Sequence, residues 1–367
     1  MIERACIIGL GLMGGSLGMA LLKAGVAREI VGYDRQGRAV ELALEVGAIN
    51  RGADGLAEAV QGAELVFLAL PVGTLPDVAG QIAPHVEPGT VVTDTGSTKG
   101  GLVPVLEEIF AGRAHYIGGH PMTGSERAGI GAADPYLFEN AVYVLTPTPK
   151  TDGDALRRLE AVLKALGARI LHLSADDHDR IVGAVSHLPH LLAVSLMGAA
   201  SRLSREYPEL LMLAAGGFRD TTRVAAGNPV MWRDIYLNNA EALLEVLELW
   251  QREIEALEDL IKARDGEGLE GVLEAARRLR LQIPGKQKGL LPALHEIVVT
   301  APDKPGVLGF IGQVLGREGI NINDIEILRV REGEGGTIRL AFTDQAAAEE
   351  ALAVLHRHGV TARRRDA

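Results

Sequence analysis

A histidine within a run of small residues is the first candidate for chemistry in this chain. The run reads Gly118-Gly119-His120-Pro121-Met122-Thr123-Gly124-Ser125-Glu126. We expect irregular backbone here, because glycines and a proline flank His120 and leave its ring little packing role. A neutral imidazole accepts protons near neutral pH, so the segment predicts that His120 takes a proton from a substrate hydroxyl group. The alternative is a histidine that merely belongs to a turn.

A second segment, Thr93-Asp94-Thr95-Gly96-Ser97-Thr98-Lys99, follows a predicted strand. Ligands of open α/β sheets bind at the carboxyl ends of strands, which makes Ser97 a candidate ligand contact. Serine is also a common helix N-cap, so Ser97 can instead cap the helix that Lys99 enters. The residues alone leave both uses open.

A third segment, Ser186-His187-Leu188-Pro189-His190, lies in a predicted helical region. Ser186 and His190 are four residues apart and therefore share one face of a helix. No cysteine or convincing third ligand accompanies them, which disfavours a zinc site. We expect these polar groups to line a pocket, and we predict no metal.

Arginines downstream of that helix are candidates for binding a substrate carboxylate. Arg219 and Arg223 lie in Gly217-Phe218-Arg219-Asp220-Thr221-Thr222-Arg223, and Arg233 follows Trp232. A guanidinium group can bind a carboxylate through two parallel hydrogen bonds. Arg233 can pair with its neighbour Asp234 instead.

The chain begins with a glycine pattern typical of dinucleotide binding. A strand leads into it and a helix follows, and its residues are Gly9, Leu10, Gly11, Leu12, Met13 and Gly14. The glycines allow a tight turn and close approach to a pyrophosphate at the helix N-terminus. Asp34, at the end of the next strand, favours NAD because its carboxylate accepts from ribose hydroxyls and repels a 2′-phosphate. Arg35 beside it keeps NADP as the alternative, and Leu70 and Pro71 are further expected cofactor contacts.

These segments need a scaffold, and the pattern of apolar residues predicts an α/β fold with three domains. Residues 1–172 alternate short apolar runs with helical patterns, which indicates a Rossmann-type, doubly wound parallel sheet. Residues 173–285 show only helical periodicity, and we expect a substrate and dimerisation domain. A linker at 286–293 then leads to a β-α-β-β-α-β pattern at 294–367, the ferredoxin-like order.

The expected strands and helices can be stated by their ranges. The helices are expected at Met13–Lys23, Leu75–Ala83 and Asp154–Leu166 in the first domain, at Asn239–Lys262 and Leu269–Leu281 in the second, and at Gly306–Arg317 and Gln345–His358 in the last. In the first domain we expect strands at Ala5–Ile8, Ile30–Tyr33, Leu65–Leu70, Val91–Asp94, Ala141–Leu145 and Ile170–Leu173. In the last domain we expect strands at His295–Thr300, Ile322–Val330, Thr337–Phe342 and Val360–Arg364.

Composition excludes several classes of function. The 367 residues carry a formal net charge of −11, which argues against binding nucleic acid or an anionic membrane surface. The single cysteine, Cys6, rules out a disulfide framework and suggests a reducing compartment. Glycines interrupt the apolar N-terminus, and no unbroken apolar run reaches the roughly 18 residues of a membrane helix. We therefore expect a soluble, cytoplasmic protein without a membrane partner.

Taken together, the motifs resemble those of the prephenate/arogenate dehydrogenase family of tyrosine biosynthesis. The ordered segments are GLGLMGGSLG, TDTGSTKG, GGHPMTGSERAG, VSHLPH and GGFRDTTRVAAGNPVMWRDI. The tail, with Asp303-Lys304-Pro305-Gly306-Val307-Leu308 and Gly319-Ile320-Asn321-Ile322, resembles an ACT domain, a small-molecule regulatory module. The resemblance implies an NAD-dependent dehydrogenase that oxidatively decarboxylates prephenate to 4-hydroxyphenylpyruvate and carbon dioxide.

The resemblance also implies roles for individual residues. His120 takes the proton of the ring hydroxyl, and Ser97 contacts that hydroxyl and orients His120. Arg223 binds a substrate carboxylate, with further substrate contacts from Ser186, His190, Ser125 and Glu126. In the tail, the expected regulatory groove includes Asp303, Gly306, Val307 and Asn321, and tyrosine is the expected inhibitor. A homodimer is expected as well.

Three other functions stay open or are disfavoured. Arogenate (cyclohexadienyl) dehydrogenase, which yields tyrosine directly, is the nearest alternative, and the sequence does not decide between the two substrates. A non-catalytic, NAD-binding amino-acid sensor would leave His120 without a purpose. β-Hydroxyacid dehydrogenases use a lysine in their helical part, and residues 165–261 contain none.

Overall fold

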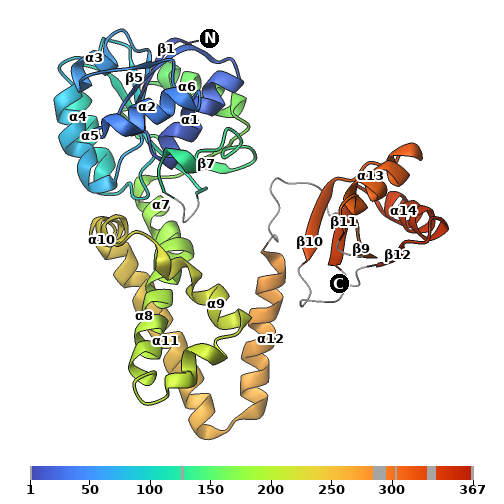
Figure 1. Cartoon of the computed structure of the whole chain (residues 1–367). Helices are drawn as coiled ribbons and strands as arrows, with labels where there is room; N and C mark the ends of the chain where they lie inside the picture. Colours follow the sequence, from blue (N-terminus) through green and yellow to red (C-terminus); the bar gives the residue numbers. More distant parts are fainter. Residues whose placement is uncertain (1, 125–127, 284–294, 302–303, 329–335, 365–367) are drawn as a thin grey trace. The chain divides into compact units, whose positions relative to one another are not determined.

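The computed structural model describes residues 2–124, 128–283, 295–301, 304–328 and 336–364 (Figure 1). Its contacts divide the chain into two compact units, Met1–Pro284 and Gly285–Ala367, which we describe separately. The linker expected at 286–293 and the regulatory candidate Asp303 lie outside the described residues, as do Ser125 and Glu126. The exact limits of the three expected domains stay a prediction.

The first unit contains an eight-stranded sheet with the order β3-β2-β1-β4-β5-β6-β7-β8. Its strands are β1 (Ile2–Ile8), β2 (Ala27–Tyr33), β3 (Arg51–Gly52), β4 (Leu65–Leu68), β5 (Val91–Asp94), β6 (His115–Pro121), β7 (Val142–Thr146) and β8 (Arg169–His172). β1 to β6 are parallel to one another, and the chain reverses its direction across the sheet between β3 and β4. The predicted Rossmann-type, doubly wound sheet is confirmed.

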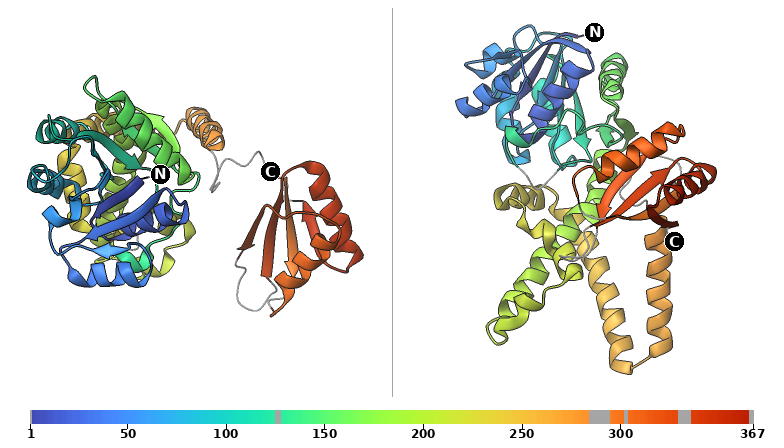
Figure 2. Two further views of the ribbon diagram at one scale, coloured as in Figure 1. Left: turned by 90° about the horizontal axis from the view of Figure 1, so that it is seen from above. Right: turned by 45° about the vertical axis from the view of Figure 1, so that its right-hand side comes forward.

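Helices cover both faces of this sheet, and each face has its own apolar core (Figures 1 and 2). On one face lie α1 (Leu12–Lys23), α2 (Gly37–Glu45) and α6 (Gly153–Ala165). On the other face lie α3 (Leu56–Val60), α4 (Leu75–Ile82) and α5 (Leu102–Phe110), with the short 3₁₀ turn η1 (Val72–Thr74) before α4. Because both faces are covered, β4 and the buried part of β1, Ala5–Ile8, are apolar, which is why the sequence predicted these strands.

The strand β6, which carries His120, was not predicted, and the expectation of irregular backbone at His120 is wrong. β6 pairs parallel with β5 and antiparallel with β7, with His120 opposite Val144. Gly118 and Gly119 have no side chains and therefore give the sequence no alternating strand pattern. The close packing of neighbouring strands nevertheless requires glycine at both positions. A Cβ at Gly118 would lie 2.4 Å from the Thr146 hydroxyl oxygen, and one at Gly119 would lie 2.7 Å from the Asp94 carbonyl oxygen. The expectation of a purely parallel sheet is corrected by the same β6–β7 pair.

The remainder of the first unit is helical, as predicted. It comprises α7 (Ala175–Val182), the π-helical turn η3 (Gly183–His187), α8 (Leu188–Leu203), η4 (Pro208–Leu213), α9 (Gly216–Thr222), η5 (Arg223–Ala226), α10 (Pro229–Asn238), α11 (Ala240–Ala263) and α12 (Gly266–Gln282). The π turn ends just before Pro189, which lacks the N–H needed to continue the ordinary helical ladder. The wider turn therefore carries Ser186 and His187, and single π turns are frequent at functional sites.

The helical part buries few apolar side chains. α7, η3 and α8 form one helical segment, Ala175–Leu203, that is long and apolar enough to cross a membrane. An 18-residue window within it has a mean hydropathy of 1.5, and 33% of that window is buried. Ser186, His187 and His190 interrupt the segment, so it is not the unbroken apolar run that the sequence was expected to lack, and a core helix of a soluble protein meets the same criteria. Exposed leucines and isoleucines also extend along α11 and α12, among them Leu249, Ile254, Leu273 and Leu279. Such exposed apolar surface is typical of a helix pair that packs against another protein surface.

The second unit is a four-stranded antiparallel sheet with the order β10-β11-β9-β12. Its elements are β9 (His295–Ala301), α13 (Val307–Arg317), β10 (Asp324–Leu328), β11 (Gly336–Phe342), α14 (Gln345–Arg357) and β12 (Thr361–Arg364). Both helices pack on one face over a small apolar core. The predicted ferredoxin-like unit is confirmed.

Candidate dinucleotide and active site

The loop between β1 and α1 has the geometry of a dinucleotide-binding turn. Gly9 has a positive φ of 95°, and a Cβ there would lie 2.3 Å from the Ala69 carbonyl oxygen. A Cβ at Gly14 would lie 1.8 Å from the Gly9 carbonyl oxygen, so the helix can begin this close to the strand only with glycine. Gly11 has open space where its side chain would be, and it precedes the first turn of α1. The free amides of that turn suit a pyrophosphate group.

Asp34 lies at the rim of this loop. One carboxylate oxygen accepts a hydrogen bond from the Leu10 amide at 2.9 Å, and the other accepts from the Gln36 amide at 2.8 Å. Each carboxylate oxygen has a second lone pair, which suits the two hydroxyls of a ribose. Arg35 is exposed, and Leu70 packs beside Gly9 at the point where the sheet order reverses. These residues fit the adenosine half of NAD.

Asp94, the last residue of β5, is fully buried and is the centre of a polar cluster. One of its oxygens accepts from the Gly96 amide at 2.7 Å and from the buried ammonium group of Lys99. The other accepts from the Tyr116 hydroxyl at 2.8 Å and from the Gly119 amide at 3.1 Å. The carboxylate therefore has hydrogen bonds to both of its oxygens and an opposite charge beside it.

Ser97 lies in the loop between β5 and α5, next to Gly96, whose amide donates to Asp94. Ser97 caps no helix. α5 begins only at Leu102, and its N-cap is Gly101 without a side-chain hydrogen bond. The capping alternative is therefore wrong. Ser97 is partly exposed, as a ligand contact requires.

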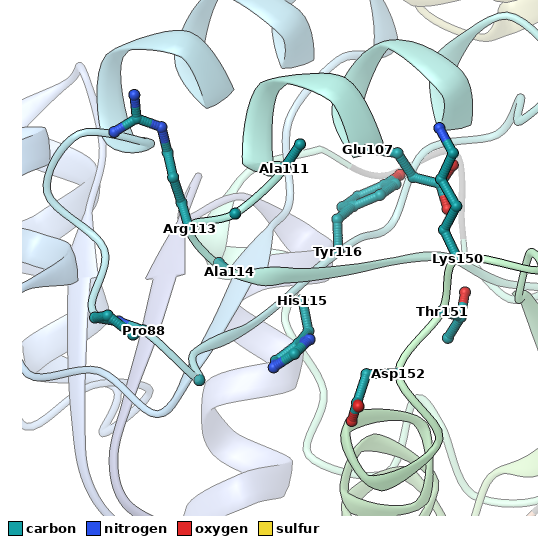
Figure 3. Close-up of a pocket in the computed structure, with 12 residues that line it drawn as sticks. Pro88, Glu107, Ala111, Arg113, Ala114, His115, Tyr116, Lys150, Thr151 and Asp152 are labelled. Atoms are coloured by element: carbon teal, nitrogen blue, oxygen red, sulfur yellow. The ribbon is translucent and has the colours of Figure 1, made fainter.

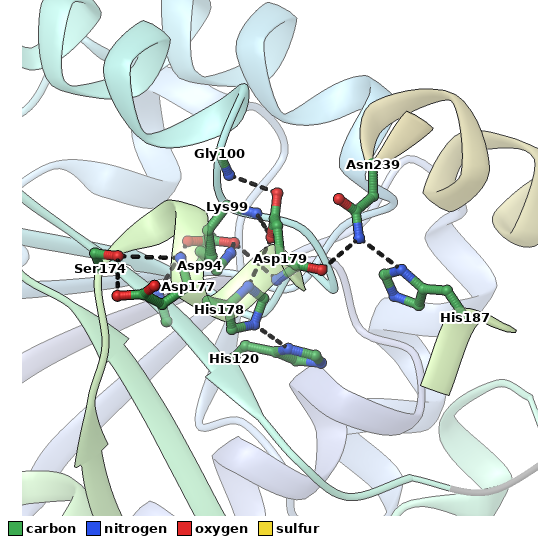
Figure 4. Close-up of polar contacts among 12 residues, drawn as sticks. Asp94, Lys99, Gly100, His120, Ser174, Asp177, His178, Asp179, His187 and Asn239 are labelled. Carbon is green, nitrogen blue, oxygen red and sulfur yellow. Dashed lines mark hydrogen bonds and ion pairs between the residues drawn. The ribbon is translucent and has the colours of Figure 1, made fainter. Parts of the chain in front are cut away.

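His120 is the first member of a hydrogen-bonded chain of three side chains (Figure 4). Its Nδ1 atom lies 2.8 Å from Nε2 of His178, and Nδ1 of His178 lies 2.7 Å from a carboxylate oxygen of Asp179. His178 and Asp179 are buried residues of α7, a helix that Ser174 caps by accepting from the Asp177 amide.

The partners in this chain determine which nitrogen of each ring carries a proton. A carboxylate only accepts, so His178 donates from Nδ1 to Asp179 and accepts at Nε2. His120 must then donate from Nδ1, which leaves the lone pair of its Nε2 to accept a substrate proton. Burial lowers the pKa of His120 well below its usual 6.5, and the charges of His178, Lys99 and His187 lower it further. His120 is thus a neutral acceptor at neutral pH.

Asp179 has a second function, because its carboxylate also accepts from the amides of Lys99 and Gly100, both at 2.7 Å. These amides directly precede α5. The helical part of the unit is in this way joined to the loop that carries Ser97. Sequence reasoning missed His178 and Asp179: the Ser174 cap signals the start of a helix, but nothing in the sequence places its next turn beside His120.

The π turn and α8 place the other two histidines. Asn239 donates to Nδ1 of His187 at 2.9 Å and to the Asp179 carbonyl oxygen at 2.9 Å. Burial lowers the pKa of His187 to about 4, so its ring is neutral. Nδ1 of His190 lies 2.6 Å from the Tyr236 hydroxyl, and the ring stacks on Trp232 with centroids 3.5 Å apart. His190 is therefore held rigidly, and Ser186 is partly exposed beside these groups in sequence.

Arg223 begins η5, which packs against α8, and its side chain is exposed. Arg219 is exposed on α9. Arg233 is paired with Asp234 at 2.7 Å, as the sequence allowed, and Arg223 stays the expected partner of a substrate carboxylate. Among the residues that the structure describes, no group of three or more His, Cys, Asp or Glu side chains could hold a metal ion.

A surface hollow of about 440 Å³ lies elsewhere on the first unit (Figure 3). His115 and Tyr116 line it, and both are at the opposite end of β6 from His120. Its charged side chains have both signs, namely Glu107, Arg113, Lys150 and Asp152. Of the residues that line the hollow, Tyr116 also belongs to the site described above, through its hydrogen bond to Asp94.

Comparisons with known proteins agree with this geometry. Residues 17–172 match the nucleotide-binding domain model of prephenate dehydrogenase, residues 174–275 match its dimerization domain model, and residues 295–360 match the ACT domain model. The chain is 36% identical over 354 residues to prephenate dehydrogenase of Bacillus subtilis, covering 95% of each chain.

Two solved structures are similar to the first unit. Prephenate dehydrogenase from Aquifex aeolicus in complex with hydroxyphenyl propionate and NAD+ is 33% identical, with a TM-score of 0.74 over 77% of this chain and 99% of that one. Synechocystis arogenate dehydrogenase is 32% identical, with a TM-score of 0.67 over 77% of this chain and 100% of that one.

Proposed function

The chain belongs to the prephenate dehydrogenase family, and we propose that it oxidatively decarboxylates prephenate to 4-hydroxyphenylpyruvate and carbon dioxide. The observation that carries this proposal is the chain from His120 through His178 to Asp179, which presents a neutral acceptor nitrogen. The reaction needs such an acceptor, because the ring hydroxyl becomes a carbonyl group as its carbon loses a hydride. NAD, when bound at the glycine loop, takes that hydride.

The remaining chemistry belongs to the substrate. Loss of carbon dioxide makes the ring aromatic, which supplies the driving force. The protein need only align the reacting groups, accept one proton and hold the carboxylates. No metal is required for these tasks.

His120 accepts the hydroxyl proton at Nε2 and becomes an imidazolium ion. Its Nδ1–H remains bonded to His178, whose own Nδ1–H is bonded to the Asp179 carboxylate. The carboxylate stabilises the positive charge through the intervening ring and keeps both rings oriented. In this proposal Ser97 contacts the same hydroxyl group.

Arg223 provides the positive charge that binds a substrate carboxylate. A protein with a net charge of −11 must place such a charge locally. Ser186 and His190 contribute further contacts along the same helical segment. Ser125 and Glu126 stay expected contacts on sequence grounds alone, since they lie outside the described residues.

The quaternary and regulatory features are proposals of the same kind. The dimerization domain match and the exposed apolar residues of α11 and α12 support a homodimer. The ACT domain supports regulation by a small molecule, and we propose tyrosine as that molecule. Gly306, with a φ of 91°, precedes the amides of α13 that suit its carboxylate. Val307 and Asn321 stay expected members of the same ligand groove on sequence grounds. A cytoplasmic location fits the single buried cysteine.

Steady-state assays with prephenate and arogenate, each with NAD and NADP, test the proposal. We expect the highest kcat/KM with prephenate and NAD. His120→Asn should lower kcat by roughly 10²–10⁴-fold with little change in NAD affinity. Preference for arogenate would instead assign the chain to the activity named for the Synechocystis relative, and a His120→Asn variant with more than a tenth of wild-type turnover would remove His120 from its role.

A further inference from the structure

One buried carboxylate links the two segments that carry the proposed reacting residues. Asp94 binds the amide of Gly96, which precedes Ser97, and the amide of Gly119, which precedes His120. Both amides are next to those residues in the chain, so a displacement of Asp94 displaces both. Ser97 and His120 otherwise come from different elements, a loop after β5 and the strand β6.

Lys99 neutralises this carboxylate. The side chains of Lys99 and Asp94 are both fully buried, and they form an ion pair. A buried ion pair adds little stability over apolar residues of the same size, because both charges must leave water. A structural role alone is therefore a weak explanation for a pair at this position.

We propose that Asp94 and Lys99 are positioning residues for the reaction, which set the spacing of Ser97 and His120. The inference rests on the proposed function. The ammonium group also acts on His120 at a distance, as one of the charges that keep its ring neutral.

Three residues from different elements contribute to that electrostatic effect, namely His178, Lys99 and His187. α7 presents His178 directly and Asp179 behind it, and η3 presents His187. Lys99 follows β5, where Asp94 is its counter-ion. The positive charge of Lys99 disfavours a second one on the His120 ring, so removal of Lys99 should raise the pKa of His120.

Two variants and one control separate positioning from structural support. Lys99→Met removes the cation, and Asp94→Asn/Lys99→Met removes both buried charges, so that the double variant leaves no unpaired charge to unfold the protein. The double variant still breaks the positioning contacts, because an amide cannot accept at both ends as the carboxylate does. Tyr116→Phe deletes one hydrogen bond to Asp94 without changing any charge.

We expect Lys99→Met and the double variant to lower kcat roughly 10- to 100-fold, with KM for NAD nearly unchanged, since small displacements of reacting groups have effects of that size. In Lys99→Met the acid limb of kcat/KM should also move to higher pH. Tyr116→Phe should lower the melting temperature and leave the acid limb in place. Wild-type kcat in the folded double variant would overturn the proposal.

A second readout does not depend on turnover. With ¹³C-labelled histidines, the His120 signal is identified by its absence in His120→Asn, and its titration is followed by NMR. We expect a higher titration midpoint in Lys99→Met than in wild type. An unchanged midpoint would overturn the electrostatic part, whereas a wild-type protein that does not oxidise prephenate would contradict the proposed function instead.

Discussion

Nδ1 of His120 lies 2.8 Å from Nε2 of His178, and the two rings meet edge to face at 69°. The contact joins a strand of the sheet to the first helix of the helical part. It makes the basicity and the orientation of His120 dependent on a residue that is buried and never reaches the substrate.

Replacing His178 with leucine should therefore impair catalysis without impairing cofactor binding. The variant removes the acceptor for His120 Nδ1–H and frees the ring to turn, and we expect kcat to fall roughly 10- to 100-fold. His172→Leu is the matched control, because His172 is an exposed histidine on β8 that pairs with Glu160. Equal kcat values in the two variants would show that the contact has no role in the reaction.

The pH dependence of the wild-type enzyme follows from the lowered pKa of His120. Only the neutral ring accepts a proton, so activity is present above this pKa and is lost as pH falls through it. Since burial holds the pKa well below 6.5, kcat/KM should stay constant down to pH 6.5 and decline only at more acid pH. A midpoint at or above pH 6.5 would mean that His120 is as solvated as a free histidine.

Arg223→Ala should weaken substrate binding. Loss of a hydrogen bond between charged groups costs about 1.5–3 kcal/mol, which corresponds to a rise in KM for prephenate of roughly 10- to 150-fold. Arg219→Ala is the control, since Arg219 is an exposed arginine in the adjacent helix. If KM rises only in Arg219→Ala, the carboxylate contact belongs to that residue.

Asp34→Asn should relax the choice of cofactor. The variant keeps an acceptor for the Leu10 amide but removes the negative charge that repels a 2′-phosphate. The ratio of kcat/KM for NAD over NADP should fall. A wild-type enzyme that already prefers NADP would show that Arg35 controls the site.

Removal of the second unit tests the tyrosine proposal. A chain that ends near Pro292 retains the compact unit Met1–Pro284 and should stay active. Allosteric coupling is typically about 1–3 kcal/mol, so tyrosine inhibition at saturating prephenate should weaken roughly 5- to 150-fold. Equal inhibition constants for the full and shortened chains would place tyrosine in the catalytic pocket.

Local sequence patterns predicted the elements whose residues alternate or repeat regularly. The glycine loop at Gly9, the buried strand Val91–Asp94 and the long helices α11 and α12 all follow from periodicity and glycine placement. β6 could not be predicted in this way, because Gly118 and Gly119 have no side chains to show a period. The glycines are explained only by the neighbouring strands that occupy the space of their side chains.

The candidate site was predictable only where a residue lies in an unusual sequence. His120 and Ser97 stand out in their motifs, but His178 and Asp179 look like ordinary polar residues in the first turns of a helix. Their importance comes from a contact over 58 residues of chain, between His178 and His120. No local pattern encodes a contact of that kind.

The bridge made by Asp179 has a mechanical consequence. Its carboxylate accepts from two amides just before α5, while α8 and α11 extend away from the sheet (Figure 1). Arg223, in η5 against α8, lies further from this anchor than His178 does, so a tilt of the helices about the anchor would move Arg223 more than His178. Such a tilt would shift the carboxylate-binding arginine while the proton-accepting ring kept its place, because His178 is bonded to the anchor itself.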